Sequence, residues 1–388
     1  MMEMSPYQAF LSIFLLLSLS ACNSDGVPLS NASQSEKEYF EDYRSPQFKW
    51  GFIDRTGKLV ISDKYDDVRD FSQGLASANY RGRWGYIDKS GKEAIPFKYK
   101  SARSFKEGIA IVEDMDGVIS LIDRDGNVLS QPQYDEVSPF KEGYARVKKN
   151  GLLGFINTQG IEVISPQYTR ATLFSNSVSI VKESDKYGLI DTSGNFIVEP
   201  THDKLSINDD GMLVVYNDNK YSFIETSGES IITGSFDGAI NFSHGYAAVK
   251  NSDKWYIIDS IGTKVSDYYD EVTEGGNNHW LYREGSQWGL LNKSGGEVTS
   301  AVYESLYAFR EGLTTYAIND LWGIMDEEGT HLTPPLFPLI WSFKNGMCRA
   351  IFNRGVGFLN REGKIAVPAH FIEVRDFHQG LARVEVPR

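Results

Sequence analysis

The sequence predicts an all-β fold built from ten tandem repeats of about 34 residues, each with three or four short antiparallel strands. Three observations lead to this prediction. One short pattern recurs at spacings of 33 to 35 residues, as expected of a repeat architecture. Aromatic residues, which favour strands, make up 13% of the chain. The 36 glycines supply turns, and no repeat contains a helical run.

Each repeat opens on a bulky residue, followed by Gly, two apolar residues, an Asp, Asn or Glu, two polar residues and Gly. We name the first position the Trp slot. It is occupied by Trp50, Trp84, Ile119, Leu153, Tyr187, Tyr221, Trp255, Trp288, Trp322 and Val356. Because aliphatic residues and Tyr replace Trp there, we interpret the slot as an internal packing position. Its five tryptophans are then structural residues.

The segment after the Trp slot predicts a strand and a tight turn. Trp84, Tyr86 and Asp88 alternate with Gly85 and Ile87, which is the period of a strand. The turn follows because an Asp side chain accepts hydrogen bonds from backbone amides two residues on, and Gly closes the loop. Eight other units have Asp or Asn at this point, and one has Glu, a poorer turn former. A short apolar strand comes next and often ends at Pro, which lacks the N–H for pairing.

The second half of each repeat predicts another strand. An aromatic residue such as Tyr99 is followed by Phe-x-x-Gly-x-small-x-apolar, as in Phe105 to Val112. The alternation is typical of a half-buried strand that forms an antiparallel hairpin with the next Trp strand. The Trp, aromatic and Phe positions of neighbouring units should therefore stack into continuous internal ladders.

The order of these segments leaves two strands without partners in sequence. They are the first Trp strand, at Trp50, and the last strand, Leu381 to Val386. They can pair with each other and close a propeller-like ring, which removes exposed edges. They can also cap an open β superhelix or solenoid. We favour the ring slightly, although ten blades are more than the usual number, roughly four to eight.

The N-terminus predicts export and a lipid anchor. Ala9 to Ser20 is apolar but too short to span a membrane, which takes roughly 20 residues. Residues 1–21 therefore read as a signal peptide. Leu19-Ser20-Ala21-Cys22 resembles the lipobox of bacterial lipoproteins, which implies lipidation of Cys22; the alternative is an ordinary signal peptide that happens to carry a Cys. Residues 22–47 are polar and predict a flexible tether before the repeats at 48–388.

The repeat pattern resembles the bacterial WG-repeat family. The resemblance rests on Trp-Gly followed by Phe/Tyr-Ile-Asp-x-x-Gly, then Pro-x-Tyr-Asp and Phe-x-x-Gly-x-Ala, and it covers Trp50 to Arg388. Literal Trp-Gly pairs begin at Trp50, Trp84, Trp288 and Trp322. The resemblance implies all-β repeat modules used as binding or scaffolding surfaces, with no common catalytic residues.

Motifs for catalysis and for metal binding are missing from the sequence. The six histidines have no metal spacing, and no Gly-x-Ser-x-Gly or phosphate-loop motif occurs. Each turn supplies one acid, whereas calcium needs roughly six to eight oxygen ligands. The net charge of −13 argues against a nucleic-acid surface. We expect no enzyme activity, cofactor, metal or nucleic-acid partner, and we expect Cys348 to be a small buried residue.

Two units depart from the pattern, at Glu274 to Tyr282 and at Pro334 to Trp341. One interpretation is tolerated drift. The other is a local binding surface whose aromatic side chains stack on a sugar or on a partner protein. Its residues would be His279, Trp280, Tyr282 and Trp341.

These features together predict a monomeric, non-catalytic protein-interaction scaffold, anchored by lipid in the cell envelope. Asn23 follows Cys22, and this resembles lipoproteins sent to the outer membrane of Gram-negative bacteria. The partner would be an envelope protein or a glycan that the sequence does not identify. A carbohydrate- or cell-wall-binding module is the alternative, and an enzyme with an unrecognised site is a remote one.

Overall fold

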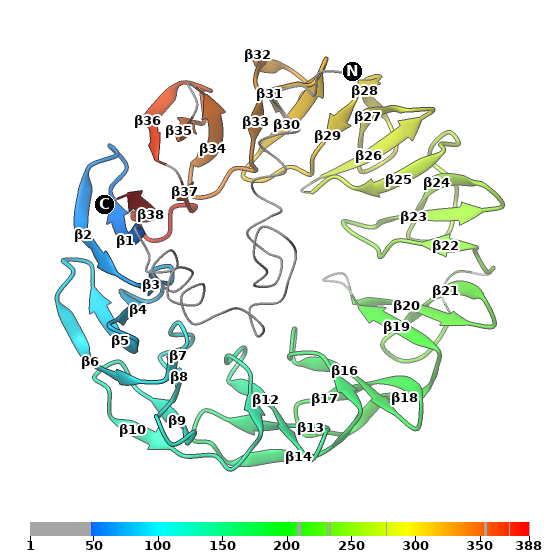
Figure 1. Ribbon diagram of the computed structural model, residues 1–388. Helices are drawn as coiled ribbons and strands as arrows, with labels where there is room; N and C mark the ends of the chain where they lie inside the picture. The colour runs from blue at the N-terminus through cyan, green and yellow to red at the C-terminus, as the bar shows by residue number, and fades with distance from the viewer. Residues whose placement is uncertain are drawn as a thin grey trace, which may run out of the picture. The chain divides into compact units, whose positions relative to one another are not determined.

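A computed structural model describes residues 48–387, apart from 208–210, 231, 233, 277, 353–354 and 372. Cys22, the predicted signal peptide and the predicted tether lie outside the described residues. Residues Lys49–Pro387 form one compact unit in which ten small antiparallel sheets are arranged as a ring (Figure 1). The prediction of an all-β repeat fold is confirmed, and the unit is a ten-bladed β-propeller. Among the described residues, no helix is long and apolar enough to cross a membrane.

The first five blades follow the chain around half of the ring, and the first of them combines the first two and the last two described strands. Blade 1 consists of β37 (Glu373–Val374), β38 (Ala382–Pro387), β1 (Phe48–Ile53) and β2 (Leu59–Tyr65). Blade 2 consists of β3 (Asp67–Val68), β4 (Leu75–Tyr80), β5 (Arg83–Asp88) and β6 (Glu93–Tyr99). Blade 3 consists of β7 (Ser101–Ala102), β8 (Ala110–Glu113), β9 (Ile119–Ile122) and β10 (Val128–Ser130). Blade 4 consists of β11 (Glu136–Val137), β12 (Tyr144–Lys149), β13 (Leu152–Asn157) and β14 (Glu162–Tyr168). Blade 5 consists of β15 (Arg170–Ala171), β16 (Val178–Glu183), β17 (Lys186–Asp191) and β18 (Phe196–His202).

The other five blades complete the ring. Blade 6 consists of β19 (Lys204–Ile207), β20 (Met212–Asn217) and β21 (Lys220–Glu225). Blade 7 consists of β22 (Gly238–Ala239), β23 (Tyr246–Asn251) and β24 (Lys254–Asp259). Blade 8 consists of β25 (Glu271–Glu274), β26 (His279–Glu284), β27 (Gln287–Asn292) and β28 (Glu297–Tyr303). Blade 9 consists of β29 (Ser305–Leu306), β30 (Leu313–Ile318), β31 (Leu321–Asp326) and β32 (His331–Phe337). Blade 10 consists of β33 (Leu339–Ile340), β34 (Met347–Phe352), β35 (Gly355–Asn360) and β36 (Ile365–Phe371).

The two strands without partners in sequence close the ring. β38 hydrogen-bonds to β1, in the strand order β2-β1-β38-β37. Blade 1 is thereby built from two strands of each chain end, with the four-strand layout of its neighbours (Figure 1). The ring is therefore confirmed, and the open superhelix is wrong. Closure removes two strand edges that an open stack would expose.

Each blade has two distinct ends. The second and third strands pair residue by residue, for example Ala76 with Ile87 and Tyr80 with Arg83. We name the end that carries this tight turn the hairpin end. The turn from the first strand to the second and the turn from the third to the fourth lie at the opposite end, which we name the turn end. In blades 6 and 7 the fourth strand is reduced to isolated bridges, such as Tyr221 with Phe236.

The predicted Asp turns are confirmed at the turn end. Asp88 Oδ1 accepts hydrogen bonds from the backbone N–H groups of Ser90, at 2.8 Å, and Lys92, at 3.0 Å. Asn157 uses its side-chain oxygen in the same way toward Gln159 and Ile161. The glycines that close these turns have positive φ, as expected.

A second set of hydrogen bonds at the turn end joins one blade to the next. The Glu107 carboxylate, in blade 3, accepts the N–H groups of Glu142 and Gly143, in blade 4, at 2.7 and 2.8 Å. Glu142 in turn accepts the N–H groups of Asn176 and Ser177 in blade 5, both at 2.9 Å. Gln73, Glu311 and Gln379 make equivalent contacts to the following blade. The second x of Phe-x-x-Gly thus links neighbouring blades, a role that the sequence pattern did not indicate.

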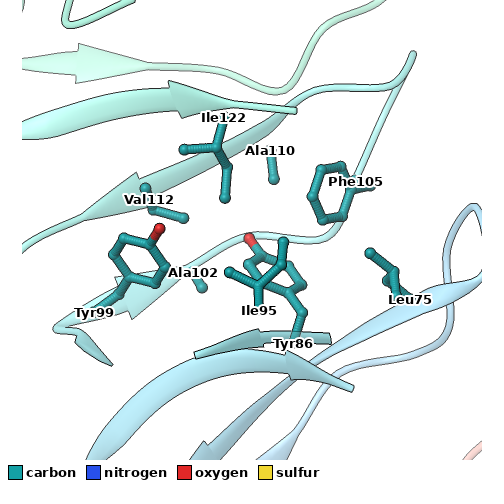
Figure 2. Close-up of a cluster of buried hydrophobic side chains, with 9 residues drawn as sticks. All are labelled: Leu75, Tyr86, Ile95, Tyr99, Ala102, Phe105, Ala110, Val112 and Ile122. Carbon is teal, nitrogen blue, oxygen red and sulfur yellow. The ribbon is translucent and has the colours of Figure 1, made fainter. Parts of the chain in front are cut away.

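The hydrophobic core is divided into ten clusters, most of which join side chains of neighbouring blades. In the cluster shown in Figure 2, Tyr86 of blade 2 packs on Phe105 of blade 3, with ring centroids 4.8 Å apart. The Tyr86 hydroxyl donates to the Arg103 carbonyl at 2.7 Å, so its polar atom is also satisfied. The positions two and three residues after the Trp slot, such as Tyr86 and Ile87, are fully buried.

The prediction that the Trp slot forms a deep internal ladder is wrong. All ten slot residues, from Trp50 to Val356, are half-buried. The slot lies at the start of the third strand, beside the hairpin end, where the interface between blades meets solvent. The positions that face the interior follow it by two and three residues.

Candidate binding pockets beside the Trp slots

The predicted aromatic surface in blade 8 lies in the core. Trp280 is 0% exposed, Tyr282 1% and His279 7%. The Trp280 indole N–H donates to the Lys293 carbonyl at 3.0 Å, and the Lys293 ammonium lies 3.7 Å from the centroid of the Trp280 ring. The Tyr282 hydroxyl donates to Glu297 at 3.0 Å. The proposal that these three residues form a binding surface is therefore corrected, because a buried ring has no face free for a ligand.

Trp280 is buried because blade 8 has a small residue where other blades have a large one, and a large residue where they have a small one. Strand pairing places Gly275 where eight of the other blades have the Phe of Phe-x-x-Gly, and it places Trp280 where blade 2 has Ala76. Trp280 packs against Ala248 and Ile257 of blade 7, as Phe105 packs against blade 2. The large ring thus fills the space that the missing Phe would leave.

His279 occupies an ordinary packing position of the repeat. Its ring packs at a tilt against Phe309 of blade 9, with centroids 4.7 Å apart, and Tyr144 also packs at a tilt against Phe174, at 5.0 Å. Burial lowers the pKa of His279, which favours the neutral imidazole. The residue therefore behaves as a core aromatic.

Trp341 in blade 10 is half-buried, and one face of its ring is covered. The Arg349 guanidinium lies 4.7 Å from the centroid of the Trp341 ring. Asp376, in blade 1, holds this guanidinium through a 2.6 Å hydrogen bond from Arg349 Nε. The predicted stacking role would have to use the remaining ring edge or face.

Four of the tryptophans in the Trp slot also have a covered face. Tyr307 stacks on Trp322, with centroids 5.0 Å apart and an angle of 8° between the rings. Guanidinium groups lie over three further slot rings, at 5.3 to 5.8 Å from the centroids. These pairs are Arg69 with Trp84, Arg383 with Trp50 and Arg283 with Trp288. The cations stabilise the rings in place, and each covers one face on which a ligand could stack.

Two pockets lie where the slot residue is aliphatic. The smaller, of about 340 Å³, lies between blades 3 and 4 beside Ile119, and we name it the blade 3–4 pocket. The larger, of about 600 Å³, lies between blades 4 and 5 beside Leu153, and we name it the blade 4–5 pocket. Such volumes are within the range of small-ligand sites, roughly 300–1,000 Å³. Loss of the large ring at the slot is the feature that the two pockets share.

The blade 3–4 pocket is mostly polar. Its wall includes the hairpin residues Gly117, Lys149 and Asn150. Tyr134 closes one side, and its hydroxyl donates to Glu162 at 2.7 Å. Burial and this hydrogen bond raise the pKa of Tyr134 to about 12. The phenol is therefore neutral and already engaged, which leaves the pocket with little free hydrogen-bonding capacity from that side.

The blade 4–5 pocket combines cations with apolar side chains. Arg146, Lys148 and Arg170 line it together with one acid, Glu136. Lys148 pairs with Glu136 at 2.9 Å, and this ammonium lowers the pKa of the Glu136 carboxyl. The apolar part of the wall consists of Leu153, Ala171, Ile180 and the Tyr187 ring. Charge and apolar surface therefore meet in one hollow, at a point where the repeat pattern has lost its Trp.

Other predicted site classes can be placed briefly. Within the described ranges, no group of three or more His, Cys, Asp or Glu side chains is arranged to hold a metal ion. Cys348 is buried, as predicted, and burial raises the pKa of its thiol to about 12. It occupies the position of Ala76, on the second strand of its blade.

Comparisons with known proteins agree with the repeat pattern. The family model described as "WG containing repeat" matches residues 50–84, 84–117, 119–152, 154–187, 187–221, 221–255, 288–322, 322–353 and 357–386. The interval between 255 and 288, which the family model does not match, contains Gly275 and Trp280. These are the two positions at which blade 8 differs in residue size from its neighbours. No curated protein matches the chain.

Solved structures with a similar arrangement share little sequence with this chain. A eukaryotic initiation factor is 12% identical over 73% of this chain and 95% of its own, with a TM-score of 0.40. The computationally designed Ika8 protein is 16% identical over 69% and 95%, with a TM-score of 0.37. BamB from Moraxella catarrhalis is 11% identical over 87% and 98%, with a TM-score of 0.34. At these values the similarities support no inference about function.

Proposed function

This chain belongs to the WG-containing-repeat family, and on that premise we propose that it is a lipid-anchored cell-envelope protein whose propeller is a non-catalytic protein-interaction scaffold. The observation that carries the proposal is the use of the repeat motif. Asp turns and capped slot rings make contacts within a blade, and inward-facing residues pack between blades, so the motif is used to build the fold. Recognition is left to surfaces where the motif changes, and the blade 4–5 pocket is the largest such hollow described above.

The anchor is proposed from the sequence around Cys22. Lipidation there, with Asn23 following, would place the propeller at the outer membrane of a Gram-negative envelope. Several acyl chains hold a protein stably where a single chain does not. Metabolic labelling with an alkyne fatty acid should label the wild-type chain and not Cys22→Ser. Labelling of both chains, or of neither, would remove the anchor from the proposal.

The scaffold role is tested by affinity capture. The propeller of residues 48–388, immobilised through its N-terminus, should retain a defined set of envelope proteins from a detergent extract. Mass spectrometry identifies the retained proteins, and an equal amount of an unrelated immobilised β-propeller is the control for nonspecific retention. A glycan array run in parallel tests the carbohydrate alternative. If the propeller binds glycans and retains no proteins, it is a carbohydrate-binding module and the scaffold function is wrong.

The covered rings make the carbohydrate alternative the weaker of the two. Sugar rings bind on open aromatic faces, and Trp50, Trp84, Trp288 and Trp322 each have a guanidinium or a second ring over one face. Trp280 and Tyr282 are buried. The aromatic residues that first suggested sugar binding therefore support packing instead.

A further inference from the structure

We propose that the blade 4–5 pocket binds a short acidic peptide segment of a partner protein. One carboxylate would lie on the cationic rim, and a neighbouring apolar side chain would lie against Leu153. This inference rests on the proposed scaffold function and names the chemistry of the partner. It requires three properties of the pocket: a cation free to pair, an apolar floor, and no open aromatic platform.

The charge of the pocket differs in sign from that of the whole chain. Three cations and one acid line it, in a protein with a formal charge of −13. Lys148 is already paired with Glu136, and the Arg146 guanidinium donates to the Ala171 carbonyl. Arg170 is exposed and, within the part of the chain that the structure describes, has no ion-pair partner. One free guanidinium suits a single carboxylate, which it can bind through two parallel hydrogen bonds.

Arg170, the free cation at the rim of the pocket, results from a local change in the repeat. In five blades the first strand is preceded by Asp, and this acid binds the hairpin at the hairpin end of the same blade. Asp135 of blade 4, for example, accepts the Asn150 N–H at 2.9 Å. In blade 5 the corresponding residues are Thr169 and Arg170. The exchange removes an acid from the rim and adds a cation beside the pocket.

The floor of the pocket has the size and polarity for one apolar side chain. Leu153 and Ile180 are half-buried, so part of each surface is open to a ligand. Covering such surface stabilises a complex by roughly 25 cal/mol for each Å² removed from water. A carboxylate next to a Leu-, Ile- or Val-like side chain would contact both parts of the pocket at once.

A peptide fits the pocket better than an acidic sugar does. The aromatic ring in the wall is Tyr187, and the Lys182 ammonium lies 5.7 Å from its centroid. That cation lies over one face of the ring, so at most one face is open to a sugar ring. A peptide needs no aromatic platform, since its side chains bind in hollows between blades.

The test compares two pocket variants with two matched controls on a peptide array. The array holds heptapeptides with a central Asp, Glu, Asn, Gln or Lys, each flanked by Leu, Val, Ser or Gly. Leu153→Trp restores the residue that five other slots carry and fills the pocket, and Arg170→Glu reverses the free charge. Ile119→Trp fills the neighbouring pocket instead. Lys106→Glu reverses an exposed cation at the turn end.

The wild-type propeller should select peptides with a central Asp or Glu beside Leu or Val. Leu153→Trp and Arg170→Glu should each lower the affinity for the selected peptide about tenfold or more, measured in solution by fluorescence anisotropy. An ion pair and an apolar contact each contribute about that factor to the affinity. Ile119→Trp and Lys106→Glu should bind as the wild type does. All four variants should melt within a few degrees of the wild type, because Arg170 and Lys106 are exposed and because Leu153 and Ile119 are Trp slots beside open pockets.

Several outcomes would overturn the inference. They are an array without acidic–apolar preference, binding that survives both pocket variants, or loss of binding in Ile119→Trp alone. Selective binding of acidic glycans in a parallel glycan array would show that the ligand of this pocket is a sugar acid and not a peptide. If the array shows no binding while affinity capture retains envelope proteins, this pocket is excluded and the scaffold function stands.

Discussion

At the scale of single residues, Gly275 and Trp280 show how one blade keeps its packing after losing a key side chain. Eight of the other blades place a Phe and a small residue at these two positions. Blade 8 places the large side chain at the other position, and the ring still reaches the neighbouring blade. The pair appears as two departures in the sequence, five residues apart. Only the strand register shows that they offset each other.

The buried role of Trp280 leads to the first prediction. Trp280→Ala should lower the free energy of unfolding by about 3–5 kcal/mol, because it opens a cavity and the adjacent Gly275 offers nothing to fill it. Trp341→Ala, the matched control, should cost clearly less, since that ring is half-buried. Urea denaturation of both variants provides the measurement. Equal losses would contradict the assignment of Trp280 to the core.

The Asp turns lead to a prediction about acid. Hydrogen bonds from neighbouring side chains, and then from backbone amides, hold the pKa of these carboxyls below the usual range. The four with this shift are Asp54, Asp88, Asp123 and Asp191. Their contribution to stability is complete above the unfolded pKa of about 4 and is lost as pH falls through the lowered folded pKa.

A fourfold Asp→Asn variant at these turns separates charge from geometry. Asn accepts the same backbone hydrogen bonds without titrating, as Asn157 does in blade 4. The variant should melt near the wild-type temperature at pH 7 and should lose less of its Tm between pH 7 and pH 3. Melting curves by circular dichroism measure both differences. An equal fall of Tm between pH 7 and pH 3 in the two proteins would show that these carboxylates do not contribute to the loss of stability in acid.

At the scale of elements, blade 1 behaves like the other blades even though its strands come from opposite chain ends. Trp50 corresponds to Trp84, so Lys49 corresponds to Arg83 and Val386 to Tyr80. In blade 2 a two-residue turn, Arg81-Gly82, joins these positions, and both residues have positive φ. This is the geometry for which Asn-Gly is favoured.

Circular permutation tests the equivalence of the blades. A permutant with Val386 joined to Lys49 through Asn-Gly, and opened between Asn150 and Gly151, keeps every strand pair of the ring. It should fold with the same far-ultraviolet circular dichroism and melt within a few degrees of residues 48–388. A permutant that fails to fold would show that closure through blade 1 needs the native chain ends.

At the scale of the whole molecule, stability depends on closure because every blade packs on two neighbours. Removing residues 381–388 deletes β38, exposes the edge of β1 and takes Ala382 and Val384 out of the buried cluster beside blade 10. We expect a larger radius of gyration by small-angle scattering and a broader unfolding transition, since an open array can unfold from its ends. The circular permutant is the control, with its cut in a hairpin. A compact, cooperative deletion variant would contradict the dependence on closure.

The sequence by itself determined the repeat length, the strands and the turns of this protein. These features depend on contacts within a few residues, such as the Asp88 side chain with the Ser90 amide, and ten copies repeat the signal. Only the tertiary structure decided how deep each position lies and whether the chain closes. The Trp slot proved half-buried, Trp280 proved buried, and β38 proved to pair with β1, because each depends on a neighbouring blade or on a strand more than three hundred residues away. The pockets beside Ile119 and Leu153 are of the same kind, since an aliphatic residue at a slot opens a hollow only where the next blade leaves it uncovered.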